Sequence, residues 1–313
     1  MASRRQPRVR VGTASWTDPT LTKEADWYPK RSMSAEERLR FYASIFTLVE
    51  VDATYYHPPT EELAALWVDR TPQDFRFDIK AYALLTQHPA QPKSVWADIA
   101  EQIDEEHRDA KSVYFNHLPE PAQDDAFERF RQALMPLHSA GKLGAVFFQF
   151  PQWFTNRRDN REYLDTLPQR LPDYQIAVEF RHASWLDGDS AEKTLKQLER
   201  LGLAYTCVDE PQGFKSSVPP VVAATADLAV VRMHGHNAEN WQRRGITAAE
   251  RFRYLYSDEE LREWAPKVQE LSQQTRETHV LFNNCYRDYG VRNARQLGEL
   301  LGEGLQQQPA GSE

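Results

Sequence analysis

The stretch QIAVEFRHASW, at residues 175–185, is an apolar run that ends in an acid, a base, an imidazole and an indole. Because successive side chains of a β-strand point to opposite faces, Ala177, Glu179 and Arg181 are predicted to share one face. A strand covered by protein on both faces can hold a carboxylate and a guanidinium only where other charges compensate them. The stretch therefore predicts a buried strand whose charged end meets polar residues from other strands.

Seven further strand-like segments alternate with helix-like segments or loops along the chain. They lie at residues 8–15, 47–54, 75–81, 144–151, 203–209, 228–235 and 279–284. Helices are expected between most of them, and Ser34 and Glu37 have the spacing of a capping box that opens one. Eight strands, each followed by a helix or a long loop, predict an α/β fold of the TIM type, a single (β/α)8 parallel barrel. One domain is expected to span residues 1–302.

Residues 84–121, after the third predicted strand, interrupt this alternation. Most strand-to-helix connections have about 2 to 6 residues, so this segment is predicted to be an insertion. We expect it to form a lid over one end of the barrel, with a helix of its own near residues 94–106. The proline-rich segment 211–220 leaves little room for a helix after the sixth strand. The low-complexity tail at 303–313 is expected to be frayed.

The composition is that of a globular protein, with 41% hydrophobic and 27% charged residues. No apolar run approaches the roughly 20 residues that a membrane span needs, and the N-terminus lacks the apolar core of a signal peptide. We therefore expect a cytoplasmic protein without membrane contact. A net charge of -8 disfavours a general duplex-binding surface. Cys207 and Cys285 lack the spacing of a thiolate zinc site, and no cofactor is expected.

Polar residues gather at the predicted carboxyl ends of the strands, which is where TIM-type barrels carry their active sites. Seven strands end in such residues, and the first ends in Trp16 instead. The polar residues are Glu50, Asp52, Lys80, Gln149, Glu179, Arg181, Asp209, Arg232, His234, Asn283 and Asn284. The sequence therefore predicts a polar site at one rim of the barrel.

Six ordered motifs resemble those of the DUF72 family, also called YecE-like. They are EVDATYY at 50–56, FRFDIKA at 75–81, FQFP at 148–151, EFRHASW at 179–185, VRMHGHN at 231–237 and FNN at 282–284. The resemblance runs from Gly12 to Leu297 and implies a TIM-type barrel whose activity is not established. The similarity of such barrels to endonuclease IV and to sugar isomerases implies a role with nucleic acids or sugars. Gln87, and Thr17 with Asp18, depart from the family pattern at the rim near strands three and one.

The charged residues at the rim carry the chemistry. Lys80, Arg181 and Arg232 are three cations that would hold an anionic group, since arginine grips phosphate or carboxylate with two donors and lysine adds a point charge. Glu50 and Glu179 are the candidate base and acid, because unequal neighbours can push their pKa values apart.

Other rim residues have supporting roles in this hypothesis. His234 is a candidate proton carrier near neutral pH, and Gln149 and Asn284 are candidate donors that orient the ligand. Aromatic side chains at the same rim would stack on sugars or bases. The aromatic candidates for ligand binding are Trp16, Tyr55, Trp185 and Trp241.

The same residues could instead form a structural network of salt bridges or a metal site. The charged groups could form a salt-bridge lattice that fills the barrel, because structural ion networks also perturb pKa values. A metal site made by His234, Glu179, Glu50 and Asp209 is disfavoured for two reasons. Only one histidine at a predicted strand end faces inward, and the interleaved Lys and Arg would neutralise the carboxylates that a metal ion needs. We expect no bound metal.

The leading hypothesis from the sequence is a metal-independent enzyme that acts on an anionic small molecule or a sugar by acid-base chemistry. One alternative is a nucleic-acid processing or binding protein, with or without the help of a metal. The other is a scaffold that binds a ligand without catalysis. The sequence favours the first of these three and gives neither the substrate nor the reaction.

Overall fold

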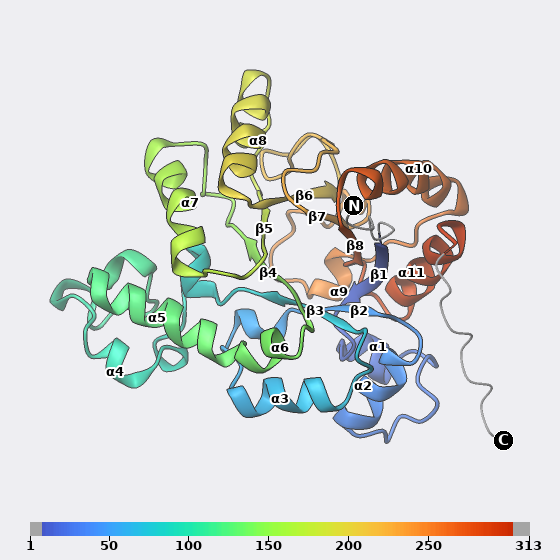
Figure 1. Cartoon of the computed structure of the whole chain (residues 1–313), viewed down its shortest axis with the longest axis horizontal. Helices are drawn as coiled ribbons and strands as arrows, with labels where there is room; N and C mark the ends of the chain where they lie inside the picture. Colours follow the sequence, from blue (N-terminus) through green and yellow to red (C-terminus); the bar gives the residue numbers. More distant parts are fainter. Residues whose placement is uncertain (1–7, 303–313) are drawn as a thin grey trace, which may run out of the picture.

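Eight parallel strands form one closed barrel in the computed structural model, which describes residues 8–302 (Figure 1). Each strand pairs with its neighbours in chain order, and β1 pairs with β8 to close the ring. The strands are β1 Arg8–Ala14, β2 Leu48–Val51, β3 Arg76–Lys80, β4 Leu143–Gln149, β5 Ile176–Glu179, β6 Ala204–Asp209, β7 Leu228–Met233 and β8 Glu277–Phe282. The predicted (β/α)8 barrel is confirmed, and the predicted frayed tail lies outside the described residues.

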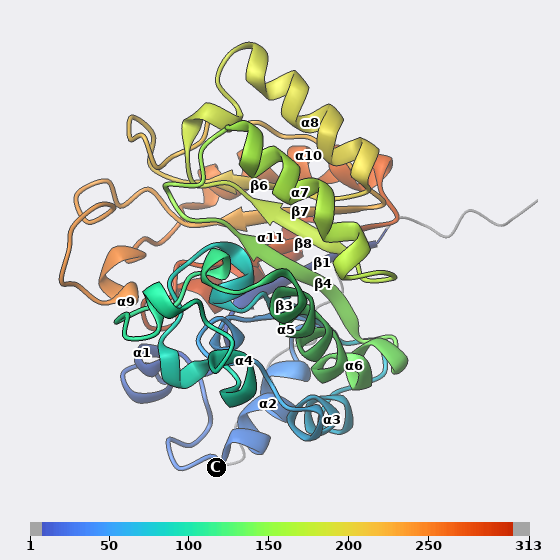
Figure 2. The ribbon, with the colours of Figure 1, turned by 90° about the vertical axis from the view of Figure 1, so that its left-hand side faces the viewer.

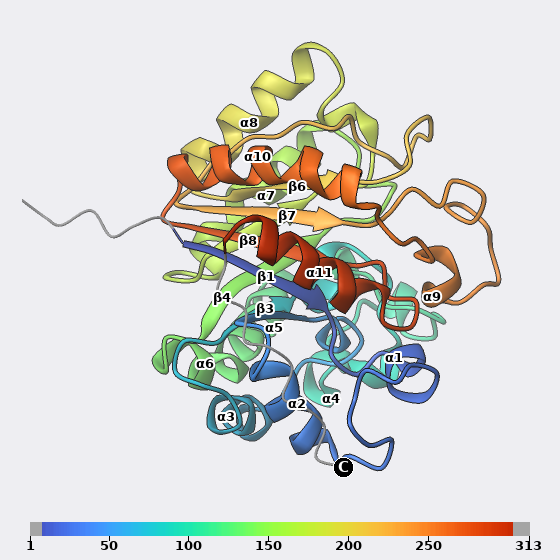
Figure 3. The same cartoon turned by 90° about the vertical axis from the view of Figure 1, so that its right-hand side faces the viewer.

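Helices surround the barrel. The longer ones are α2 Ala35–Ala43, α3 Glu61–Asp69, α5 Glu120–Ala133, α7 Arg158–Arg170, α8 Asp189–Leu201, α10 Asp258–Gln274 and α11 Tyr289–Leu300. The shorter ones are α1 Pro19–Lys23, α4 Ala97–Ala100, α6 Met135–Ser139 and α9 Ala248–Arg251. Figure 3 shows α10 and α11 over β7, β8 and β1. Ser34 and Glu37 form the predicted capping box at the start of α2, and the chain between β6 and β7 contains no helix, as its prolines predicted.

Side-chain alternation along the strands fills the barrel interior. An apolar cluster lies inside it, made of Leu48, Ala145, Phe147, Ala177, Ala204, Leu228, Val230 and Leu281. Two residues further along β2, β5 and β7, the same face carries Glu50, Glu179 and Arg232, none of them more than 1% exposed. The predicted parity of these strands is therefore confirmed, and charged groups lie above an apolar floor.

The segment between β3 and α5 is long, and its helix is shorter than predicted. It contains α4, flanked by the 3-10 turns Pro92–Ser94 and Glu105–His107. The chain turns back after α4, where the backbone N–H of Asp104 donates to the carbonyl of His117. Phe115 packs its ring against Phe127 of α5, and Figure 2 shows α4 beside α5. The segment therefore lies against the helix layer. We call the opening of the barrel at the carboxyl ends of the strands the mouth, and His88, near the beginning of the segment, borders it beside Tyr55.

Candidate functional site

Arg232, at the carboxyl end of β7, joins two buried carboxylates from other strands. Its Nε and Nη2 donate to the two oxygens of Glu50 at 2.9 and 2.7 Å, and its Nη1 donates to Glu179 at 2.9 Å. The guanidinium carbon also lies 4.7 Å from the centre of the Phe147 ring. We call Glu50, Glu179 and Arg232 the lattice. Each of the three nitrogens of Arg232 therefore donates to a carboxylate of the lattice.

The second carboxylate oxygen of Glu179 also interacts with neighbouring side chains. Its Oε1 accepts hydrogen bonds from Gln149 and from Nη1 of Arg181, and lies 3.4 Å from Nε2 of His234. Burial would raise the pKa of this carboxyl, but Arg232, His234 and Arg181 outweigh burial and hold the pKa well below its usual range. Glu179 is therefore a permanent carboxylate that positions its neighbours.

Glu50 and His234 respond differently to the same surroundings. Burial raises the pKa of Glu50, although Arg232 and Lys80 oppose this effect. Burial lowers the pKa of His234 to about 4, so its imidazole is neutral at pH 7. Its Nδ1 lies 2.9 Å from the side-chain nitrogen of Asn283. An imidazole whose Nδ1 accepts from an amide carries its proton on Nε2, which here faces Glu179.

A second ion pair joins Arg181 to Glu210. Nη1 of Arg181 lies 3.1 Å from Oε2 of Glu210, and its guanidinium lies over the ring of Trp241. No partner within residues 8–302 contacts its Nε and Nη2, and its side chain is 13% exposed. Burial raises the pKa of Glu210 to about 7. Sequence reasoning missed this glutamate, which alternation from Ala204 along β6 would have placed inside the barrel.

Lys80, at the end of β3, has no counterion in direct contact within residues 8–302. Its Nζ lies 5.0 Å from the centre of the Tyr55 ring and makes no hydrogen bond or ion pair with any residue in the described part of the chain. Burial and the positive charge of Arg232 lower the pKa of Lys80, while Glu50 and Asp52 act in the opposite direction. The mouth therefore contains a half-buried amine that, within residues 8–302, interacts with carboxylates only at a distance and forms no direct ion pair.

An aromatic row borders the mouth next to Lys80. The rings of Tyr56, Tyr55, His88 and Trp153 follow one another at centroid distances of 5.0, 5.2 and 5.8 Å. Tyr56 is 66% exposed and Trp153 is 57% exposed, so both offer ring faces to solvent. Tyr55 was expected here, whereas Trp153 was missed, although it lies just after the FQFP motif at the end of β4.

Three of the predicted site residues lie away from these groups. The side-chain nitrogen of Asn284 donates to the carbonyl of Tyr254 and to Asn293, because alternation along β8 turns Asn283 inward instead. Trp185 is fully buried in a 3-10 turn and donates to the carbonyl of Phe154.

Trp16 packs edge-on against Trp67 of α3 at 6.3 Å. Trp241 contacts Arg181 but is 3% exposed. None of Trp16, Trp185 and Trp241 therefore presents a free ring face at the mouth.

The carboxylates of the mouth are already engaged by protein donors. Arg232 occupies oxygens of Glu50 and Glu179, and the Tyr256 hydroxyl donates to Asp209 at 2.6 Å. Within residues 8–302, no group of three or more His, Cys, Asp or Glu side chains could hold a metal ion. Over the same residues, no helix has the length and apolar character to cross a membrane.

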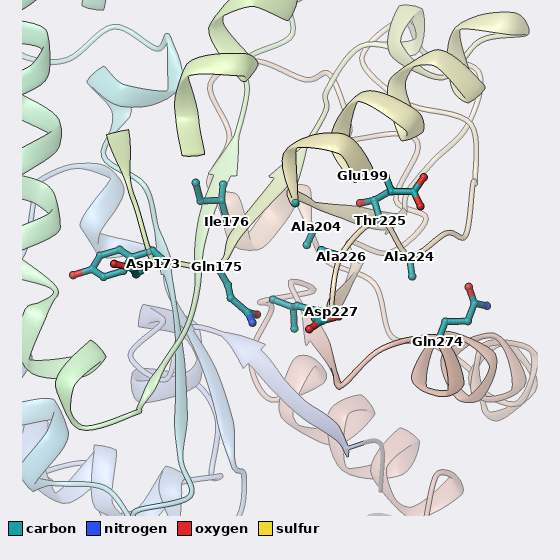
Figure 4. A pocket seen from close by; sticks show the side chains of 13 residues that line it. Asp173, Gln175, Ile176, Glu199, Ala204, Ala224, Thr225, Ala226, Asp227 and Gln274 are labelled. Carbon is teal, nitrogen blue, oxygen red and sulfur yellow. The ribbon is translucent and has the colours of Figure 1, made fainter. Parts of the chain in front are cut away.

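Open pockets also lie at the opposite end of the strands. One of about 600 Å³ is lined by the starts of β5, β6 and β7, and Figure 4 shows Gln175 and Asp227 among its side chains. Another of about 720 Å³ is lined by Arg10, Arg76 and Glu277, among others. Active sites of such barrels lie at the carboxyl ends of the strands, and the unpaired amine lies there too, so we place the candidate site at the mouth.

Comparisons with known proteins place this architecture in one group. A family model described as a protein of unknown function, DUF72, matches residues 10–313. The UPF0759 protein YunF of Bacillus subtilis (strain 168) is 31% identical over 297 residues, which cover 94% of this chain and 94% of that protein.

Two crystal structures of DUF72 family proteins have a similar fold. The protein from Enterococcus faecalis V583 is 26% identical with a TM-score of 0.74, covering 96% of this chain and 99% of its own. The protein from Thermotoga maritima MSB8 is 30% identical with a TM-score of 0.73, covering 95% and 100%.

Proposed function

This chain belongs to the DUF72 family of proteins of unknown function, and we propose that the mouth of its barrel is the active site of an enzyme that acts on a small anionic molecule or an anionic sugar by metal-independent acid-base chemistry. Membership confirms the resemblance that six sequence motifs indicated. The observation that carries the proposal is the unpaired amine of Lys80. Removing a charge from water without a partner is unfavourable, so a ligand that contacts Lys80 accounts for its position.

The donors that remain free describe the ligand. All three nitrogens of Arg232 donate to carboxylates of the lattice, whereas Nε and Nη2 of Arg181 make no hydrogen bond or ion pair with the described residues. One carboxylate or phosphate on Arg181 would use the planar pair of donors that arginine offers to such groups. The exposed ring of Trp153 provides a face on which a sugar ring can stack. These features favour a small molecule with a single anionic group.

Proton transfer falls to groups whose pKa values shift toward neutrality and whose polar atoms are not held by Arg232. Burial lowers the pKa of Lys80, raises that of Glu210 to about 7 and raises that of Asp52. Acids and bases work best when their pKa lies near the operating pH. Glu50 and Glu179, the candidates from the sequence, have their oxygens held by arginines, so in this proposal they position Arg232 and Arg181.

The nucleic-acid alternative has less support. Stacking on successive bases needs several free ring faces, and the rings of Trp16, Trp185 and Trp241 are buried, which leaves those of Tyr56 and Trp153. The net charge of -8 also opposes the electrostatic attraction on which nucleic-acid binding depends. A small anionic ligand needs neither feature.

Deuterium exchange tests the proposal without knowledge of the substrate. Sugar phosphates, oxo acids and uncharged sugars would be incubated with the protein in D2O, and the loss of C–H signals would be followed by proton NMR. We expect exchange in at least one anionic compound, and we expect Lys80→Met to slow it by about 100-fold or more, as removal of an acid-base group does. Lys196→Met, on the surface, is the matched control.

The outcomes separate the hypotheses. Binding of an anionic compound, seen as a rise in melting temperature without exchange, would favour the scaffold alternative. Exchange that survives in a folded Lys80→Met protein would contradict the role given to Lys80. If the melting curve of Lys80→Met remains cooperative, the variant is folded, and its loss of deuterium exchange is not caused by unfolding.

A further inference from the structure

We propose that Lys80 is a nucleophile that forms an imine with the carbonyl group of an anionic aldehyde or ketone. The inference rests on the proposed function, because it places the covalent step in the same mouth. Lysine amines form such imines with carbonyl substrates when burial or a nearby cation keeps part of the amine neutral. The geometry around Lys80 meets both conditions.

Contacts distinguish Lys80 from other lysines of the chain. Lys142 is buried, but its Nζ donates to the carbonyls of Val68 and Thr71 at 2.6 and 2.7 Å, which holds it in place. Lys196 is exposed and pairs with Glu192. The Nζ of Lys80 has neither kind of contact within residues 8–302, and it lies on the face of the Tyr55 ring. Its lone pair, once the amine is neutral, is free to react.

Burial favours the neutral amine of Lys80, and together with Arg232 it outweighs the carboxylates that act in the opposite direction. Burial and Arg232 lower its pKa, whereas the pKa of Lys196 is raised by its hydrogen bond to Glu192. Each unit by which an amine pKa falls increases the neutral fraction at pH 7 about tenfold. Lys80 therefore carries more reactive amine at neutral pH than Lys196 does.

The covalent step balances with water as its only by-product. The amine lone pair attacks the carbonyl carbon, a C–N bond forms as the C=O π bond breaks, and one proton moves from nitrogen to oxygen to give a carbinolamine. The hydroxyl then leaves as water while nitrogen loses its remaining proton or keeps it as an iminium. Asp52, whose pKa burial raises, acts on Lys80 electrostatically and is the candidate donor of the proton that leaves with water. No oxidant or reductant is required.

Arg181, which lies beside the lattice, determines the class of substrate in this proposal. Glu179 lies within the electrostatic reach of Lys80 and accepts a hydrogen bond from Arg181 at 3.3 Å, so both cations flank one carboxylate. A substrate that reacts at Lys80 can place its anionic group on the free donors of Arg181. The class is a short aldehyde or ketone with one carboxylate or phosphate.

Reductive trapping tests the imine. The protein would be incubated at pH 7 with sodium cyanoborohydride and one of three probes: glyoxylate, glyceraldehyde 3-phosphate or uncharged glyceraldehyde. Mass spectrometry of peptides would give labelling rates for Lys80 and Lys196. We expect at least one charged probe to label Lys80 faster than Lys196, by about tenfold for each unit that separates the two pKa values. The carboxylate and phosphate probes show which anion the mouth accepts.

A conservative variant separates this inference from the proposed function. Lys80→Arg keeps the positive charge but cannot form an imine, and Lys196→Arg is its matched control. Loss of deuterium exchange in Lys80→Arg, with an unchanged melting temperature, is expected. Exchange that persists in Lys80→Arg, or labelling of Lys80 no faster than Lys196 by any probe, would overturn the imine and leave the acid-base proposal standing. Rapid trapping without exchange in the wild-type protein would instead contradict the acid-base proposal.

Discussion

Charge is buried at both ends of the barrel interior, in two groups that differ in how they are neutralised. Toward the amino ends of the strands, Nδ1 of His279 lies 2.9 and 3.0 Å from the two oxygens of Asp78. Toward the carboxyl ends lie the lattice and Lys80, and the amine has no counterion in the described residues. We call the His279–Asp78 pair the lower group, and the lattice together with Lys80 the upper group. The charges of the lower group are paired, whereas the upper group leaves one cation without a direct ion pair.

Space differs between the two groups as well. A Cβ atom at Gly144 would lie 2.9 Å from Cε1 of His279, so only glycine fits beside this pair. The upper group instead borders solvent through Arg181 and the exposed ring of Trp153. A filled and neutralised layer fits a structural role, while an open layer with a free amine fits a ligand site.

The largest effect on stability is expected from removing the centre of the lattice. Arg232→Met leaves the two buried carboxylates of Glu50 and Glu179 without their partner, and breaking a buried ion pair costs about 3 to 5 kcal/mol. We expect a loss near the upper end of that range in the free energy of unfolding, measured by urea denaturation. Arg244→Met, an exposed arginine, is the control. An unchanged midpoint would mean that the lattice contributes little to stability.

The next effect concerns the lower group. Asp78→Asn removes the charge that faces His279, but His279 can lose its own proton in response, so the loss should lie near about 3 kcal/mol. Urea denaturation at pH 6.5 measures it, with the surface substitution Asp109→Asn as control. If Asp78→Asn and Asp109→Asn lower the free energy of unfolding by similar amounts, the buried pair of Asp78 and His279 contributes no more to stability than a surface aspartate.

The same pair predicts how stability depends on pH. Burial opposes a charged His279, but Asp78 outweighs burial and raises its pKa from 6.5 to about 9. Because the folded-state pKa is raised, the stabilisation is complete below pH 6.5 and is lost as the pH rises from 6.5 to about 9. The expected loss is up to about 3 kcal/mol. His279→Gln should flatten the pH dependence in this window, and an unaltered slope would assign it to other groups.

Alternation along strands is the part of this architecture that the sequence predicted well. Glu50, Lys80, Glu179, Arg232 and His234 converge because parity is a local property that survives folding. Pairing is not local. Arg232 and Glu50 are 182 residues apart, and no spacing in the sequence indicates that this arginine, rather than Lys80, takes both carboxylates.

Residues beyond the strand ends were predicted less well, because alternation stops there. Trp185 lies in a 3-10 turn and Trp16 follows a residue with positive φ, so neither continues the face of its strand. Asn284 differs from Asn283 by one position, and one position reverses the face. Glu210 was missed because it lies one residue beyond the end of the predicted sixth strand, although the alternation from Ala204 continues to it.

The smallest change in stability is expected at Lys80, although its change in activity should be large. Lys80→Met removes a half-buried cation that has no counterion within residues 8–302, and replacing a poorly compensated charge with an apolar group of similar size is often neutral or stabilising. The free energy of unfolding should therefore change by less than about 1 kcal/mol in either direction, as for a substitution that breaks no buried pair. Denaturation beside Arg232→Met, in the same buffer, measures the difference. A loss as large as that of Arg232→Met would place Lys80 within the lattice and remove the contrast between the two ends of the barrel, because the upper layer would then be as fully neutralised as the lower one.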